Sequence, residues 1–389
     1  MFDVATATIK DDFSTLDGWG IQNRVWGYTG TQTHGGVITD NVCYDADGNL
    51  VLIANGDYYE GDKKGINASY SSVRGGKRTG AAVKSRRAYG YGSFEVEMTV
   101  PAFNGICTSI WLYNNFPDET AGRENHNYEI DIELHGTAVK ENGALRNDGN
   151  LSSMACTTWL TEKDYKSQYV AAGKPLNDGA FHKFRFDWHS DKVEFYLDGR
   201  LMHTTRQYIP DNEMYFNIGC WFPNNWCGEP NFETDYLTVK SFSYKPFSEK
   251  ANSLHADPQA GNGTINAAVT VPGRNYFANG SLEYDVGKNE AFTVTGTHEW
   301  SKGKLSFDGS LSQTIDIDSA GLSYLLELEM TAGAEVSVAY QTFVGGVKTL
   351  KTETVSDGAV LSPPEGTTRM VFTFTGKAKL QSVRLTLAK

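Results

Sequence analysis

Short stretches of alternating hydrophobic and polar residues recur along the whole chain. One of the clearest spans residues 91–100, where apolar and polar positions alternate until Pro101 ends the pattern. Such alternation places successive side chains on opposite faces of an extended strand. Asp198-Gly199 lies between two such stretches and is typical of the turn of a β-hairpin. The pattern therefore predicts an all-β fold.

The same alternation continues into the last third of the chain after a clear break. The polar, glycine-rich residues 248–265 have the composition of a linker. We therefore predict two β-sandwiches in series: a first domain over residues 1–247, a linker over 248–265, and a second, smaller β-sandwich over 266–389. The strand-like segments of the second domain are residues 311–317, 336–340, 370–374 and 383–387.

Composition narrows the range of functions. Of the 389 residues, 40% are hydrophobic, which is enough for sizeable cores and excludes a disordered chain. No apolar run approaches the roughly 18 residues of a membrane helix, so no transmembrane segment is expected. The chain has 35 Lys and Arg against 47 Asp and Glu, a formal net charge of −12. This balance argues against nucleic acid or an anionic membrane as a partner, because either would need a basic face.

The cysteines do not form a metal-binding pattern. There are five of them, all in the first two thirds of the chain, and no two have the spacing of a zinc site. The odd number also argues against a dense disulfide framework. A single bridge between Cys220 and Cys227 stays open as an alternative to free thiols.

The most informative segment is residues 127–136, which read Asn-Tyr-Glu-Ile-Asp-Ile-Glu-Leu-His-Gly. On a strand, Glu129, Asp131 and Glu133 share one face, and the apolar residues between them share the other. Three aligned carboxylates repel one another, and nothing adjacent in sequence neutralises them. Two interpretations are open: an edge strand whose charges discourage aggregation, or a catalytic carboxylate pair with an intermediate acid.

The spacing of the acids favours catalysis. Retaining glycoside hydrolysis needs a carboxylate nucleophile and an acid/base about 5–5.5 Å apart. Neighbouring like charges raise at least one pKa, which keeps a proton available for the leaving group. The Cα atoms of Glu129 and Glu133 are about 13 Å apart at roughly 3.3 Å per residue, so their side chains must lean toward each other. Glutamate is long enough for this, and the shorter Asp131 lies between them.

Several blocks in order resemble glycoside hydrolase family 16 over roughly residues 10–247. The acidic strand matches the family signature E-I-D-I-E, and the other blocks are residues 89–96, 104–113, 181–199 and 220–226. The resemblance implies a jelly-roll sandwich with substrate along its concave face. It further implies Glu129 as nucleophile, Glu133 as general acid/base and Asp131 as the residue that steadies the nucleophile. The residues alone do not decide which of the two glutamates is the nucleophile, because the strand is nearly symmetric.

Departures from the family pattern concern the substrate. The uninterrupted acidic strand resembles the branch of lichenases and plant xyloglucan-active enzymes. Ala82 and Lys84 stand where lichenases have an acid and an arginine, His34 stands in place of an asparagine, and Asn127-Tyr128 in place of Trp-Asp. We expect a retaining, endo-acting hydrolase of a β-glucan with 1,3 and/or 1,4 linkages. The alternatives are an endo-β-galactosidase on a galactan or host galactose-containing glycan, a transglycosylase and a non-catalytic lectin.

Aromatic side chains stack on the apolar faces of sugars, so those expected in the cleft are candidates for substrate binding. For each of them the alternative is a place in the hydrophobic core. Two histidines are polar candidates, with structural hydrogen bonds as their alternative. The candidates are Trp111, Trp221, Trp226, Tyr113, Trp26, His34 and His135.

The resemblance also bears on cofactors and partners. It implies a polysaccharide or oligosaccharide as the partner and no required cofactor. Many family members hold a structural calcium, but Leu237 stands where a calcium-binding aspartate is expected. Only a calcium site built from backbone carbonyls therefore stays open.

The second domain carries less information. Residues 275–283 weakly resemble the opening of carbohydrate-binding jelly-roll modules, and Trp300, Tyr324 and Tyr340 are candidates either for a sugar platform or for the core. The N-terminus lacks the basic and apolar regions of a signal peptide. A polymeric substrate implies a secreted or cell-surface protein, so we interpret the chain as a mature form.

Overall fold

The computed structural model confirms the all-β fold. It describes residues 4–24, 34–65, 76–116, 126–135, 138–141, 144–147, 152–223, 227–252, 275–283, 285–287, 291–317, 321–342 and 346–388. Within these ranges the regular elements are β-strands and one short 3₁₀ turn, Thr39–Asn41. None of the described segments forms an apolar helix with the length to cross a bilayer.

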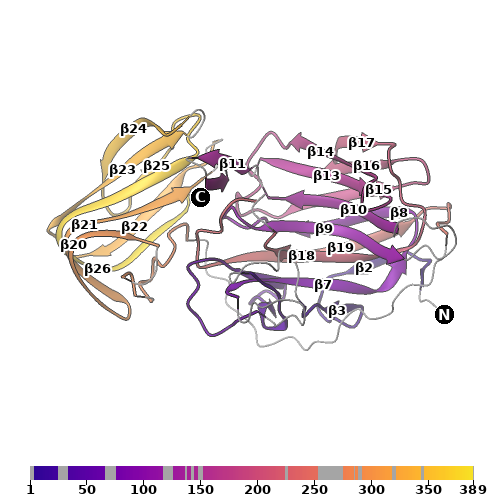
Figure 1. The fold of residues 1–389 in the computed structure, drawn as a ribbon, viewed down its shortest axis with the longest axis horizontal. Coiled ribbons are helices and arrows are strands. Elements are labelled where there is room, and N and C mark those ends of the chain that lie inside the picture. The colour runs from indigo at the N-terminus through magenta and orange to yellow at the C-terminus, as the bar shows by residue number, and fades with distance from the viewer. Residues whose placement is uncertain are drawn as a thin grey trace.

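The first domain is a sandwich of two layers, and the layer called sheet A here contains the acidic strand. Its strands follow in the order β14–β13–β10–β9–β18–β7, and most of them lie side by side in Figure 1. Both β3 and β1 pair with β7 at the far edge. The bounds are β14 (Tyr165–Ala171), β13 (Ser153–Trp159), β10 (His126–Leu134), β9 (Cys107–Phe116), β18 (Met214–Trp221), β7 (Arg78–Tyr89), β3 (Trp19–Ile21) and β1 (Val4–Ala5).

The other layer, sheet B, has the order β17–β16–β15–β8–β19–β6–β5. In addition, β2 pairs with β19, and β4 and β6 pair with the start of β7, which joins the two layers. The bounds are β17 (Arg200–Thr205), β16 (Val193–Leu197), β15 (His182–Trp188), β8 (Gly92–Met98), β19 (Thr234–Pro246), β6 (Leu50–Asn55), β5 (Val42–Tyr44), β2 (Ile9–Asp11) and β4 (His34–Val37). A separate hairpin consists of β11 (Ala138–Glu141) and β12 (Ala144–Asn147).

The core of the first domain fills the space between the two sheets. Alternate residues of β8 are buried, as the sequence pattern predicts, and Phe94 stacks on Phe216 of β18 with ring centroids 5.6 Å apart. On β10 the residues between the acids, Ile130 and Ile132, are fully buried in this core. The apolar face of the acidic strand therefore anchors it, and its acidic face points out of the sandwich.

The second domain is a smaller β-structure with its own core. Its long strand β26 pairs with β21 and β23 through its first half and with β22 through its second half. The bounds are β20 (Thr293–Ser301), β21 (Lys304–Asp316), β22 (Tyr324–Met330), β23 (Ala334–Thr342), β24 (Lys348–Val355), β25 (Val360–Leu361) and β26 (Arg369–Leu387). Most of the predicted linker 248–265 lies outside the described residues, so the domain bounds stay a prediction.

The three aromatic residues that the sequence left between a sugar platform and the core lie in the core or pack against it. Tyr324 and Tyr340 are fully buried in the second domain. Trp300 packs against the same core, and its indole N–H donates to the Leu282 carbonyl at 2.9 Å. Burial therefore excludes Tyr324 and Tyr340 from a sugar platform.

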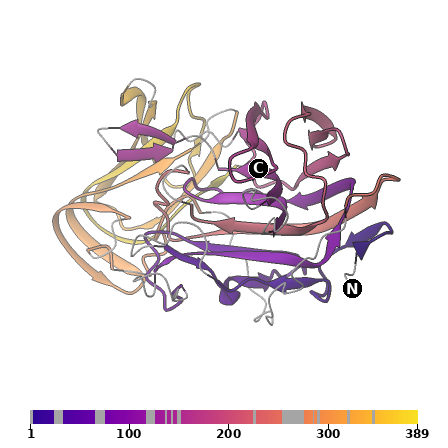
Figure 2. The same cartoon turned by 45° about the vertical axis from the view of Figure 1, so that its right-hand side comes forward.

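The second domain packs against one end of the long strands of the first, as Figures 1 and 2 both show. Phe103 lies in the contact, with its ring 6.0 Å from that of Tyr276 and stacked on Phe232 at 5.1 Å. The Tyr276 hydroxyl donates to the backbone carbonyl of Asn177 at 3.3 Å, and the Asn177 amide donates to the Ala102 carbonyl at 3.1 Å. The loop that contains Asn177 therefore ties the two domains together.

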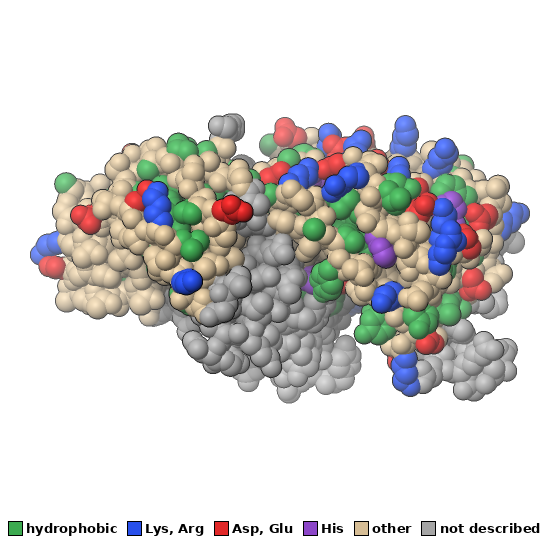
Figure 3. All heavy atoms as spheres, turned by 90° about the horizontal axis from the view of Figure 1, so that it is seen from above, with side chains coloured by type: hydrophobic (Ala, Val, Ile, Leu, Met, Phe, Trp, Pro, Cys, Tyr) green, Lys and Arg blue, Asp and Glu red, His purple; other side chains and the backbone are tan. Residues whose placement is uncertain are grey.

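Charges of both signs are mixed on the surface. On the face drawn in Figure 3, lysine and arginine side chains lie among aspartates and glutamates and form no continuous basic field over the described residues. This arrangement agrees with the net charge of −12. Exclusion of nucleic acid as a partner remains a prediction.

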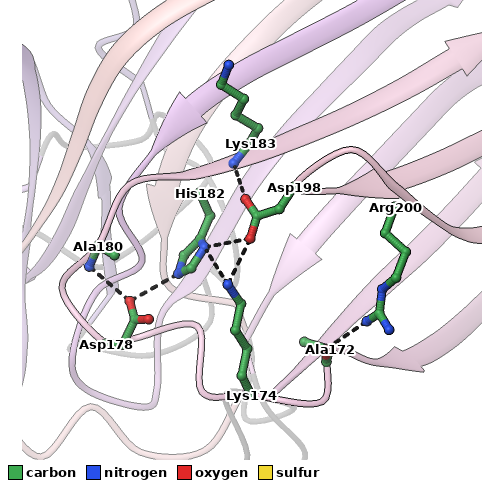
Figure 4. Close-up of polar contacts among 8 residues, drawn as sticks. All are labelled: Ala172, Lys174, Asp178, Ala180, His182, Lys183, Asp198 and Arg200. Carbon is green, nitrogen blue, oxygen red and sulfur yellow. Dashed lines mark hydrogen bonds and ion pairs between the residues drawn. The ribbon is translucent and has the colours of Figure 1, made fainter.

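A buried histidine fixes the loop at the domain contact (Figure 4). His182, at the start of β15, lies 3.0 Å from Asp178 through Nε2 and 3.0 Å from Asp198 through Nδ1. Lys174 adds a 2.8 Å ion pair to Asp198. Burial alone lowers the pKa of His182, but the bonds to the two aspartates outweigh it and raise the pKa. His182 is therefore structural.

We predict that His182→Gln destabilises the protein most on the acidic side of neutral pH. The folded-state pKa of His182 is raised, so its stabilisation is fully present below the ordinary value of 6.5 and is lost as pH rises through the folded-state pKa. The cost at low pH is about 1.5–3 kcal/mol, the range for hydrogen bonds to charged groups. Denaturant unfolding on both sides of neutrality measures it.

His203→Gln is the matched control for this experiment. Burial lowers the pKa of His203, so this substitution should become relatively more stabilising as pH falls, the opposite trend. Equal pH dependence of the two variants would contradict the assigned role of His182.

Candidate active site

The acidic strand occupies the middle of sheet A. Strand β10 pairs with β9 on one side and β13 on the other, and both pairings are antiparallel. Glu129, Asp131 and Glu133 are hence surrounded by side chains of neighbouring strands. The interpretation of an edge strand protected by charge is therefore wrong, because β10 has no free edge at these residues.

The register of the strands defines the surface around the three acids. Residues directly opposite one another share a face, since side chains alternate along every strand. Each acid is the middle residue of a row that crosses β14, β13, β10, β9 and β18 in that order. The row through Glu129 is Tyr165, Trp159, Glu129, Tyr113 and Tyr215, and the row through Asp131 is Ser167, Thr157, Asp131, Trp111 and Asn217. The row through Glu133 is Tyr169, Ala155, Glu133, Ser109 and Gly219.

Asp131 is the most enclosed of the three acids. It is only 5% exposed, and the indole N–H of Trp159 donates to its Oδ2 at 3.0 Å. Burial raises the pKa of Asp131 well above its ordinary value, and the charges of Glu129 and Glu133 raise it further. Asp131 therefore keeps its proton at a pH where an ordinary aspartate is ionised.

Glu129 is half-buried and accepts hydrogen bonds that suit a carboxylate. The side-chain amide of Asn127 donates to Oε2 at 3.0 Å, and the carboxyl of Asp131 hydrogen-bonds to Glu129 as well. Burial and the charge of Glu133 raise the pKa of Glu129 to about 8, although both hydrogen bonds act in the opposite direction. The charged form of Glu129 is thus specifically supported by two donors.

Glu133, at the other end of the row, has a weaker donor. The Cys107 thiol, at the start of β9, lies 3.4 Å from its Oε1. Burial raises the pKa of Glu133, and the thiol lowers it only in part. Within the described part of the chain no lysine or arginine pairs with any of the three acids. The row therefore retains protons near neutral pH.

The structure brings three of the predicted aromatic residues to this face. Tyr113 lies opposite Glu129 and is half-buried. Trp221 is the last residue of β18 and lies opposite Cys107 of β9, on the same face as the acids. Trp111 is opposite Asp131 but is only 4% exposed, because its ring lies over Gly219, where an added Cβ would be 3.2 Å from it. Little of the Trp111 ring is available for a sugar.

The remaining predicted residues are placed less directly. His135 follows β10 and is 2% exposed, with Nε2 3.4 Å from the Tyr169 hydroxyl. It supports Tyr169 and does not line an open surface itself. His34 starts β4, but its side chain lies outside the described structure, as do Trp26 and Trp226 entirely. Their roles stay predictions.

Sequence reasoning missed three aromatic residues on this face. Trp159 and Tyr165 stack with ring centroids 4.0 Å apart beside Glu129, and Tyr169 lies in the row of Glu133. Tyr165 and Tyr169 are 48% and 50% exposed, so their rings are open to a ligand. These residues were found only through the register, which places β13 and β14 beside the acidic strand.

Two further expectations concern metals and disulfides. Leu237 is a fully buried core residue without a ligating atom, and the described residues contain no cluster of three or more metal-ligating side chains. These residues do not fit a calcium site made by side chains. All five cysteines are free, so a Cys220–Cys227 bridge is wrong: the partner of the Cys227 thiol is Cys107.

These features define a class of protein. The family model for glycosyl hydrolases family 16 matches residues 39–238, which are 200 of the 389 residues and include the acidic strand. The chain therefore belongs to glycosyl hydrolase family 16, and the predicted resemblance is confirmed.

Individual relatives match only parts of the chain. A beta-glucanase of Bacillus subtilis (strain 168) is 30% identical over 154 residues, or 38% of this chain and 55% of that protein. A beta-glucanase of Fibrobacter succinogenes (strain ATCC 19169 / S85) is 22% identical over 264 residues, or 67% of this chain and 65% of that protein. The solved beta-glucanase of Bacillus licheniformis aligns with 62% of this chain and 99% of its own, at 22% identity and a TM-score of 0.46. The chain thus spans between about half and two thirds of the length of these curated relatives.

We predict that Asp131→Asn makes the protein more stable at neutral pH. The asparagine oxygen still accepts from Trp159, and its NH₂ still donates to Glu129, so both hydrogen bonds remain. The folded-state pKa of Asp131 is raised, so wild-type stability falls as pH rises above the ordinary value of 3.8 toward the folded-state pKa. The variant lacks this loss.

Thermal unfolding as a function of pH measures this effect. The midpoint should rise by about 3 °C at neutral pH, the shift that about 1 kcal/mol produces in a domain of this size, and the difference should vanish in acid. Asp47→Asn, at an exposed loop position, is the control and should change nothing. A difference between variant and wild type that is no larger at pH 7 than at pH 4 would contradict the raised pKa of Asp131.

Proposed function

We propose that this protein is a retaining, endo-acting glycoside hydrolase that cleaves internal β-linkages of a polysaccharide. The observation that carries the proposal is the row Glu129, Asp131 and Glu133 in the middle of sheet A. Its carboxyl groups hold protons near neutrality and are not neutralised by basic partners among the described residues. Retaining hydrolysis needs one ionised and one protonated carboxyl group on the same face.

The hydrogen bonds support distinct roles for the two glutamates. Glu129 accepts from the Asn127 amide and from the Asp131 carboxyl, which stabilises its carboxylate and suits a nucleophile. Glu133 has only the weak thiol donor of Cys107, and burial raises its pKa to about 7, so near neutral pH it can both give and take a proton, which suits the general acid/base. The pKa of Glu129 is raised to about 8, so the assignment of the nucleophile rests on its hydrogen bonds and on the family match and not on the order of the two pKa values. Asp131, itself protonated, would donate to Glu129 and release it as the covalent bond to the sugar forms.

The catalytic cycle then follows from these positions. Glu133 protonates the glycosidic oxygen while Glu129 attacks the anomeric carbon from the opposite side, which forms a glycosyl–enzyme ester. Glu133, now ionised, removes a proton from water, which cleaves the ester with net retention. No redox or metal cofactor is needed for either step. A calcium bound through backbone carbonyls would be structural.

The aromatic surface supports a polymer as the substrate. Trp159, Tyr165 and Tyr169 lie on one side of the acids, and Tyr113 and Trp221 lie on the other. Rings on both sides of the cleavage point bind sugars that precede and follow the scissile bond, which is the requirement for endo action. A substrate of this size does not enter cells, so we propose that the protein acts outside the cell or at its surface.

A β-glucan is the preferred substrate, with a galactose-containing glycan as the rival. Ala82 is buried beside Trp111, and Lys84 places its ammonium 4.3 Å from the ring of Tyr215. The charged pair of a lichenase-type subsite is thus replaced by a methyl group and a lysine that is engaged with a tyrosine. This change supports a linkage preference that differs from strict mixed-linkage β-glucan.

We predict that Glu129→Gln abolishes turnover and retains binding. Gln keeps the hydrogen-bonding shape of the site but cannot attack the anomeric carbon. The wild type and the variant are incubated with β-glucans, galactans and mucin-type glycans, and the products are sized. The wild type should shorten at least one polymer, and the variant should bind that polymer without shortening it. Binding without cleavage by the wild type itself would make the protein a lectin.

We predict a different pattern for Glu133→Ala. Loss of the general acid slows glycosidic bonds with poor leaving groups by about 10²–10⁴-fold, whereas activated aryl glycosides need little protonation in the first step. Initial rates on both substrate types separate the two effects. Equal losses on both substrates would contradict the acid/base role. Addition of excess oligosaccharide acceptor to the wild type tests the transglycosylase alternative, because a transglycosylase forms longer products.

A further inference from the structure

Two buried thiols adjoin the acid at one end of the catalytic row. Cys107 begins β9 and is fully buried, and its Sγ lies 3.4 Å from Oε1 of Glu133. Cys227, 1% exposed in the loop after β18, hydrogen-bonds to Cys107. The two thiols come from segments 120 positions apart in the chain, and Cys107 contacts both Cys227 and the carboxyl group of Glu133.

We propose that Cys107 is a positioning residue that sets the proton affinity of Glu133, with Cys227 as the alternative partner of its thiol. This inference rests on the proposed function, in which Glu133 is the general acid/base. It adds a residue that acts through Glu133 without touching the substrate.

The chemistry of a thiol suits this position. The S–H group rotates about the Cβ–Sγ bond, so it can donate to Glu133 when that carboxyl is ionised and to the Cys227 sulfur when Glu133 carries the proton. A thiol is a weak donor, so it supports the carboxylate without making it too weak a base. Glu133 must both give and take a proton in one cycle, and a donor that follows its protonation state serves both steps.

The surroundings of Glu133 leave the thiol as its specific partner. Glu129 and Asp131 lie on the same strand, Tyr169 faces Glu133 from β14, and His135 contacts the Tyr169 hydroxyl. Opposite it are Ser109 on β9 and Ala155 on β13. Among the described residues, Cys107 is the side chain that donates a hydrogen bond to Glu133.

Three side chains at position 107 test the proposal. Serine donates more strongly than a thiol, and alanine does not donate at all. The pH dependence of kcat/KM on the cleaved polymer reports the pKa of the general acid as its basic limb. We expect this limb to lie lowest for Cys107→Ser, higher for the wild type and highest for Cys107→Ala. Successive steps should be about half a pH unit, which corresponds to one weak hydrogen bond.

A matched control separates this effect from packing. Cys156 on β13 is also a buried free thiol in sheet A, but it lies opposite Ile132 and faces the core. Cys156→Ala should lower stability and leave the basic limb in place. Thermal unfolding of each variant confirms that it is folded. If Cys107→Ala does not fold, the nearly isosteric Cys107→Ser variant still tests the proposal.

Direct titration of ¹³C-labelled glutamate carboxyl groups by NMR should give the same order without any substrate. The NMR titration reports the effect of the thiol on the pKa of Glu133 independently of catalysis. An inactive wild type with the expected order of titration would defeat the proposed function and leave the thiol effect standing. An active series with one common basic limb, or an equal shift in Cys156→Ala, would overturn the inference.

Discussion

The repulsion among three carboxyl groups on one strand face is the constraint around which this structure is organised. Glu129, Asp131 and Glu133 are held in the middle of a sheet, and burial raises the pKa of each. Such a row destabilises the ionised protein, so it persists only because the other face of the strand is anchored. Ile130 and Ile132 supply that anchor in the core of the sandwich. The fold thus keeps three carboxyl groups with raised pKa values side by side.

Each of the three acids has a different hydrogen-bond donor. An amide and a protonated carboxyl support Glu129, an indole N–H holds Asp131, and a thiol reaches Glu133. Groups that are alike in sequence therefore have unlike environments. The aromatic residues of β9, β13 and β14 flank this asymmetric centre on the same face of the sheet.

Sequence reasoning succeeded where the information is local. A period of two residues places Glu129, Asp131 and Glu133 on one face whatever their neighbours are, and the same period predicted the strands. It failed where the outcome depends on register between distant strands. Trp159 reaches Asp131 only because β13 pairs with β10, and Trp111 is buried because Gly219 of β18 lies beneath it. Proximity in sequence likewise suggested Cys220 as the partner of Cys227, whereas in the fold the Cys227 thiol hydrogen-bonds to Cys107.

The covalent intermediate offers the most direct test of the central claim. A 2-deoxy-2-fluoro glycoside with a good leaving group forms the glycosyl–enzyme ester and slows its hydrolysis, so the ester accumulates. Peptide mapping by mass spectrometry then locates the sugar. The account predicts one adduct, on the peptide that contains Glu129 and on that side chain. An adduct on Glu133, or products of inverted anomeric configuration with no adduct, would contradict it.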